Sequence, residues 1–135
     1  MIAVVDDSDS VRKALILQLR LSGYVTRGFA SGEEFLQTWP SNGARCLILD
    51  LHMPGLSGVD VQRNLNRMQA RIPVIIVSAS DSSAVREECL RLGAFDFLSK
   101  PIAMPILLDA LAGTLHDDMV KRHLRGESHL ISGTL

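Results

Sequence analysis

This sequence of 135 residues has no excess of either charge and no long apolar run. Its 14 Lys and Arg residues nearly balance 15 Asp and Glu residues, for a net charge of −1, so the chain has no general attraction to nucleic acid or anionic lipid. No segment approaches the roughly 18 apolar residues of a membrane span. The first residues, Met1–Val5, reach two aspartates before they could form the core of a signal peptide. We therefore expect a cytoplasmic protein that by itself binds neither membrane nor DNA.

Cysteine is also scarce, and the only two, Cys46 and Cys89, lie in apolar periodic segments. Small buried thiols are more common in such places than disulfides or nucleophiles, and they suit a reducing compartment. Apolar residues make up 47% of the chain and charged residues 21%, which excludes a disordered protein. The length fits a single domain with one proper core.

Short apolar runs alternate with longer segments of helical period, and this alternation predicts βα units around a parallel sheet. Nearly unbroken apolar runs are typical of central strands covered on both faces, and four occur: Ile2–Val5, Cys46–Leu49, Val74–Val77 and Phe95–Leu98. Tyr24–Phe29 alternates apolar with polar or small residues, which predicts a half-exposed edge strand, the second in chain order.

Helical signals fill the segments between these strands. Val11, Leu15, Leu19 and Leu21 mark the first helix, and the capping box Ser31–Glu34 opens the second. The other helices are expected at residues 57–69, 83–92 and 105–115.

The helical pattern weakens after the fifth predicted helix, and Arg125–Ser128 interrupts it. We therefore expect one domain over residues 1–115, followed at 116–135 by a helical extension, a linker stub or a tail. Because this last segment is too short for a helix-turn-helix domain, any output module would lie outside these residues.

Each predicted central strand ends in a residue with useful chemistry. In chain order these residues are Asp6 and Asp7, then Asp50, then Ser78, then Lys100 followed by Pro101. In an open parallel sheet, ligands bind at the carboxyl ends of the strands, beside the point where the strand order reverses. If right-handed crossovers place the first and third strands side by side, Asp7 and Asp50 face each other across about 5 Å. A single acid at a strand end is usually a turn residue or a helix cap, but five suitable residues on four strand ends indicate a site.

Neighbouring carboxylates repel one another unless a cation shares their site. Oxygen ligands with room for water favour Mg²⁺, which commonly takes one or two carboxylates and a phosphate oxygen. Lys100 would start about 10 Å from Asp50, and its flexible side chain can cross most of that gap to place an ammonium beside a phosphoryl oxygen, with the Ser78 hydroxyl between them. The pattern therefore indicates that Asp50 is a nucleophile that accepts a phosphoryl group.

Four segments resemble the receiver domain of bacterial response regulators: Val4–Asp7, Leu47–Gly58, Val77–Ala79 and Leu98–Pro101. Residues 11–15, 29–33 and 53–59 are most similar to receivers of the nitrogen-fixation regulator type, which precede a LuxR-type DNA-binding domain. The resemblance implies a flavodoxin-like α/β fold, a (βα)5 doubly wound parallel sheet in strand order 2-1-3-4-5. It also implies a two-component signalling switch that regulates transcription through an output domain or partner.

The resemblance implies that Asp50 takes its phosphoryl group from a sensor histidine kinase, a phosphotransfer protein or a small phosphodonor. Mg²⁺, or Mn²⁺ in its place, would be bound by Asp7, Asp50 and the backbone carbonyl of His52, and by Asp6 through water. The His52 side chain would lie at the rim, where it controls access of water. Together with Ser80, it would tune the lifetime of the phosphoryl group.

Ser78 and Lys100 would bind the phosphoryl oxygens, and the Lys100–Pro101 bond is typically cis in such domains. Where many receivers carry Tyr three residues before the lysine, this chain has Phe97, which can change rotamer but cannot donate a hydrogen bond. Movement of Ser78 toward the phosphoryl group should free space for Phe97 and repack the face of the fourth helix and fifth strand. A phosphorylation-dependent homodimer through that face is a further hypothesis.

Three other interpretations compete with the switch. A haloacid-dehalogenase-like phosphatase also uses an aspartyl nucleophile and Mg²⁺, but the acid/base position two residues past the nucleophile is here His52, and the acidic pair Asp117–Asp118 lies too far along the chain. A degenerate receiver would act without phosphorylation, which the complete site argues against. A flavodoxin-like FMN carrier needs a phosphate-binding loop after the first strand, where this chain has two acids. We expect a signalling protein that catalyses only its own phosphorylation and dephosphorylation.

Overall fold

A computed structural model describes the backbone of residues 1–124 and the side chains of residues 1–115. Five parallel strands form one sheet in the order β2-β1-β3-β4-β5, which confirms the predicted fold class. The strands are β1 (Ile2–Val5), β2 (Thr26–Phe29), β3 (Cys46–Asp50), β4 (Val74–Ser78) and β5 (Asp96–Ser99). The helices are α1 (Asp9–Leu21), α2 (Gly32–Thr38), α3 (Gly58–Arg67), α4 (Ser83–Arg91) and α5 (Met104–Leu124).

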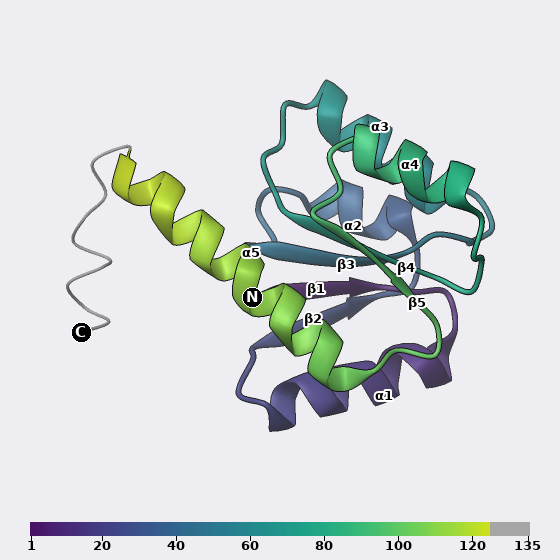
Figure 1. Ribbon diagram of the computed structural model, residues 1–135, viewed down its shortest axis with the longest axis horizontal. Coiled ribbons are helices and arrows are strands. Elements are labelled where there is room, and N and C mark those ends of the chain that lie inside the picture. The colour runs from purple at the N-terminus through teal and green to yellow at the C-terminus, as the bar shows by residue number, and fades with distance from the viewer. Residues whose placement is uncertain (125–135) are drawn as a thin grey trace.

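The helices form two layers, with α2, α3 and α4 on one face of the sheet and α1 and α5 on the other (Figure 1). Each central strand contributes to both layers because successive side chains point to opposite faces. On β1, for example, Val5 packs under α2 and α3, whereas Val4 packs under α1 and α5. All residues of β1, β3 and β4 are buried, as expected for strands covered on both sides.

The two cysteines are free and buried, as the sequence predicts, and they lie one in each layer. Burial raises the pKa of the Cys46 thiol to about 11, and burial followed by the charge of Glu88 raises that of Cys89. Thiolate is the nucleophilic and metal-binding form of cysteine, so these residues serve packing.

The structure corrects several element boundaries. β2 begins at Thr26 rather than at residue 24, because the Tyr24 N–H closes the end of α1 by donating to the Leu19 carbonyl. Leu21 does not join the core and is 79% exposed. It lies two residues past Leu19, which places it on the opposite side of the helix. α3 ends at Arg67, two residues before the predicted end, because Gln69 is in the left-handed region with φ +56°.

The last helix, α5, runs from Met104 to Leu124, past the expected end of the fifth helix near residue 115, as in the helical extension that is one of the alternatives for the residues after it. In Figure 1 its final turns extend beyond the edge of the sheet. The interruption predicted at residues 125–128 lies outside the described residues. None of the helices described here is long and apolar enough to span a membrane.

Candidate functional site

An acidic cluster forms where β1 and β3 end side by side. The carboxylates of Asp6, Asp7 and Asp50 each offer an oxygen within 4.8 Å of the others. Asp6 and Asp50 are buried and Asp7 is exposed. β1 pairs directly with β3, so their last residues reach the same edge of the sheet, and the aspartates at these two strand ends are neighbours as the sequence predicts.

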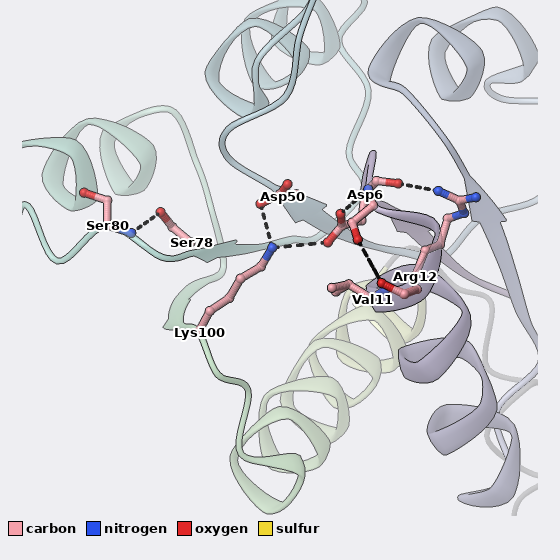
Figure 2. A network of polar contacts seen from close by, with 9 residues as sticks. Asp6, Val11, Arg12, Asp50, Ser78, Ser80 and Lys100 are labelled. Carbon is pink, nitrogen blue, oxygen red and sulfur yellow. Dashed lines mark hydrogen bonds and ion pairs between the residues drawn. The ribbon is translucent and has the colours of Figure 1, made fainter.

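Lys100 completes the cluster from the far side of β4. Its Nζ lies 3.2 Å from Asp50 Oδ1 and 3.3 Å from Asp6 Oδ2, so one ammonium contacts two carboxylates (Figure 2). The peptide bond between Lys100 and Pro101 is cis. Because these contacts with Asp50 and Asp6 reach across β4, the lysine side chain crosses the gap that separates β5 from β3.

Charge in the cluster is unbalanced, since three carboxylates face one ammonium. Burial, followed by the charge of Asp6, raises the pKa of Asp50, although Lys100 opposes this effect. Burial lowers the pKa of Lys100, but its hydrogen bonds and charge interactions with Asp50 and Asp6 outweigh burial and raise it. The ammonium therefore stays charged at neutral pH, and the site still favours a further cation.

The donor set fits Mg²⁺, which prefers carboxylate oxygens and keeps part of its water shell. Buried Asp50 and Asp6 and exposed Asp7 provide oxygens at both the protein side and the water side of the cluster. His52 follows Asp50 by two residues and its side chain is exposed, so its ring lies at the surface as expected. Its backbone carbonyl remains a predicted ligand.

Asp6 is held by contacts that the sequence did not reveal. Its Oδ1 accepts a hydrogen bond of 2.9 Å from the Ser8 N–H, and its carbonyl accepts one of 2.7 Å from Arg12 Nη1 (Figure 2). Arg12 lies on α1, within residues 11–15, the first of the segments similar to nitrogen-fixation regulators. This similarity was the only signal in the sequence for a role of Arg12. Its target becomes evident only when α1 is packed beside the end of β1.

The predicted phosphoryl ligand Ser78 begins a series of hydroxyl contacts that leads to α4. Ser78 is fully buried, and its Oγ accepts a hydrogen bond of 3.0 Å from the Ser80 N–H (Figure 2). Ser80 Oγ accepts one of 3.2 Å from the Ser82 N–H, and Ser82 Oγ caps α4 by accepting from the Val85 N–H at 3.4 Å. The structure thus connects the Ser78 side chain to the start of α4 through alternate serines.

Phe97, the predicted switch residue, points into the core layer beneath α4. It is 6% exposed and packs in the same cluster as Cys89 of α4. In the described structure it therefore acts as a core aromatic, and its role in switching remains a prediction.

Gly58 allows the backbone after Asp50 to close tightly. A Cβ at this position would lie 2.8 Å from the Asp50 carbonyl oxygen and 2.9 Å from Leu51 Cα. We expect Gly58→Ala to lower the free energy of unfolding by about 1–3 kcal/mol, because backbone atoms cannot move away as a flexible side chain can. Chemical denaturation measures this loss.

Gly113→Ala is the matched control for Gly58→Ala. The Gly113 Cβ would meet only the ring of Phe95, at 3.1 Å, and alanine is the better helix former. Equal stability of Gly58→Ala and wild type would show that the connection after β3 is not closely packed.

Comparisons with known proteins agree with this geometry. The sequence model described as "Response regulator receiver domain" matches residues 2–112. Nodulation protein W of Bradyrhizobium diazoefficiens is 35% identical over 122 residues, which cover 90% of this chain and 54% of that protein. Transcriptional regulatory protein FixJ of Rhizobium meliloti is 33% identical over 108 residues, covering 80% of this chain and 53% of the relative. The chain thus spans about half the length of these curated relatives.

Solved structures show the same similarity. The crystal structure of FixJ-N has a TM-score of 0.78 at 32% identity and covers 84% of this chain and 90% of its own. The response regulator StyR has a TM-score of 0.84 at 31% identity, over 98% of this chain and 67% of its own. Together with the acidic cluster and Lys100, these matches show that the chain belongs to the response regulator receiver domain family of two-component signalling.

Proposed function

We propose that this chain is a phosphorylation-dependent switch in which Asp50 accepts a phosphoryl group from a phosphohistidine on a histidine kinase or phosphotransfer protein. The observation that carries this proposal is the contact of one ammonium, Lys100 Nζ, with both Asp50 and Asp6 inside a cluster of carboxylates. An Asp50 oxygen would attack phosphorus, the bond from phosphorus to the donor imidazole would break, and the imidazole would leave with the bonding electrons and take up a proton.

Asp7, Asp50 and the backbone carbonyl of His52 would hold Mg²⁺, with Asp6 acting through water, and Mn²⁺ would substitute. When bound, the ion neutralises charge on the phosphoryl oxygens. Lys100 would bind one of these oxygens, which only requires its ammonium to remain where it now contacts Asp50. The Ser78 hydroxyl would bind another. His52 and Ser80 would control the access of water and so the lifetime of the acyl phosphate.

The response would travel through the serines and Phe97. If Ser78 turns toward the phosphoryl group, its Oγ no longer accepts from the Ser80 N–H, and the contacts that lead to the cap of α4 are lost. Phe97 would then move into the vacated space and repack the face of α4 and β5. A shift from 1:99 to 99:1 between the two states needs about 5.5 kcal/mol of differential stabilisation.

The chain would regulate transcription through an output domain or a partner and would bind DNA only in that way. The similarity to FixJ, a transcriptional regulatory protein, supports this assignment. A homodimer through α4 and β5 would form after phosphorylation. The chain would catalyse only its own phosphorylation and dephosphorylation.

Incubation of the purified protein with Mg²⁺ and acetyl phosphate tests the proposal. We expect a labile adduct of about 80 Da by intact mass, located on Asp50 by peptide mapping. Analytical centrifugation of the beryllofluoride-treated protein should show a larger sedimentation coefficient. Steady turnover of an external phosphomonoester would instead indicate a phosphatase, and an unchanged sedimentation coefficient would count against the dimer.

A further inference from the structure

The connection from β3 to α3, residues 51–57, carries the backbone carbonyl of His52 that is expected to bind the metal. Its far end returns to the strand, because the Gly58 N–H donates a hydrogen bond of 2.8 Å to the Leu51 carbonyl. Ser57 and Asp60 then form a reciprocal capping box that fixes the start of α3. Both ends of the connection are therefore held, and the position of its middle depends on other contacts.

Besides the apolar contacts of Met53 and Leu56 with the core layer, this connection contacts one carboxylate from α2. Glu33 Oε1 accepts a hydrogen bond of 3.3 Å from the Leu56 N–H. Gly55, with φ +75°, lies close to the other oxygen, because a Cβ added to Gly55 would lie 2.7 Å from Glu33 Oε2. A Cβ on Gly32 would lie 3.5 Å from Leu56 Cβ, so the start of α2 and the connection are also in van der Waals proximity. Both oxygens of Glu33 thus face Gly55 and Leu56.

The first turn of α2 is fixed well enough to support this contact. Gly32 is buried, and a Cβ there would clash with Val61 Cγ2 of α3, so the two helices pack closely at this point. Ser31 caps α2 by accepting from the Glu34 N–H at 3.1 Å, and Phe35 is fully buried. The backbone of Glu33 is therefore held between a cap and a core residue.

We propose that Glu33 is a positioning residue for the metal site: it holds Gly55 and Leu56 so that the connection presents the His52 carbonyl toward Asp7 and Asp50. This inference rests on the proposed function, since it assumes that the cluster binds Mg²⁺. Glu33 touches neither the metal ligands nor the phosphoryl acceptor. Its effect passes through the backbone of residues 52–56, as groups around a metal site orient its ligands.

The experiment compares Glu33→Ala, Glu33→Gln and Glu34→Ala with wild type in Mg²⁺ titrations followed by calorimetry. We expect Glu33→Ala to weaken Mg²⁺ binding about three- to tenfold, the usual range for loss of one hydrogen bond. Glu33→Gln keeps an acceptor oxygen and should recover most of the affinity. Glu34→Ala removes the same charge from the next residue, whose carboxylate accepts from the Ala30 N–H instead, and should bind Mg²⁺ as wild type does.

Hydrogen exchange of the Leu56 amide without metal is the second readout. It should be faster in Glu33→Ala than in wild type and in Glu34→Ala, because only the first variant removes its acceptor. Circular dichroism confirms that each variant is folded. Equal Mg²⁺ affinity of Glu33→Ala and Glu34→Ala, while wild type binds Mg²⁺, would overturn this inference alone. Absence of Mg²⁺ binding by wild type would overturn the proposed function and this inference with it.

Discussion

Asp50→Asn is expected to abolish the phosphoryl adduct formed with acetyl phosphate. The amide keeps the size of the carboxylate but lacks the anionic oxygen that attacks phosphorus, and it removes one of the three acids of the cluster. Intact mass spectrometry with Mg²⁺ and acetyl phosphate measures the result. Asp109→Asn, which makes the same charge change at an exposed position of α5, should form the adduct as wild type does. An undiminished adduct in Asp50→Asn would show that another residue is the acceptor.

The same substitution should change stability in a pH-dependent way. The pKa of Asp50 is raised above its ordinary value of 3.8 by burial and by Asp6. The stability linked to this raised pKa is complete below 3.8 and is lost as pH rises through the folded-state pKa. At neutral pH without metal, Asp50→Asn should therefore have a higher Tm than wild type, and the difference should shrink toward pH 4.

Addition of Mg²⁺ should make the Tm of wild type higher than that of Asp50→Asn. A ligand at about a hundred times its Kd stabilises the folded state by about 2.7 kcal/mol, and only wild type retains the full set of acids. Thermal melts at several pH values, with and without Mg²⁺, provide the comparison. A metal-free Tm that is lower in Asp50→Asn than in wild type at neutral pH would contradict the assignment of Asp50 as a strained carboxylate.

Lys100→Ala is expected to slow phosphorylation by acetyl phosphate about 10²–10³-fold, the usual loss when one charge-stabilising donor is removed from an active site. The ammonium contacts Asp50 and Asp6, so its removal also leaves these carboxylates without their internal cation. Mg²⁺ binding should therefore be retained or become tighter while phosphorylation falls. This difference separates Lys100 from the metal ligands, because loss of a metal ligand should weaken both Mg²⁺ binding and phosphorylation.

Rates of adduct formation and Mg²⁺ titrations of Lys100→Ala provide the two measurements. Lys13→Ala, an exposed lysine of α1, should change neither quantity. The pKa of Lys100 is raised from 10.5, so no loss of rate from its deprotonation should occur below that pH in wild type. A parallel fall of Mg²⁺ affinity and phosphorylation in Lys100→Ala would contradict the separate roles.

Much of the fold could be predicted because its signals are local. An apolar run such as Ile2–Val5 marks a strand buried on both faces, and Asp7 or Asp50 after such a run must lie at a carboxyl edge of a parallel sheet. The contacts of Arg12 and Glu33 could not be predicted, because each reaches a backbone group of another element. Their partners depend on how the helices pack, and residue type and spacing along the chain carry no information about that packing.

By itself, the sequence determined the alternation of strands and helices along the chain, the burial of the central strands on both faces and the strand-end positions of the acids and the lysine, because these follow from the periodicity of apolar residues and the direction of parallel strands. Only the tertiary structure decided that Lys100 bridges Asp6 and Asp50, that alternate serines connect Ser78 to α4, and that Glu33 supports the connection after Asp50. Such contacts join residues far apart in the chain. Their distances depend on crossovers and close packing, which no single segment specifies.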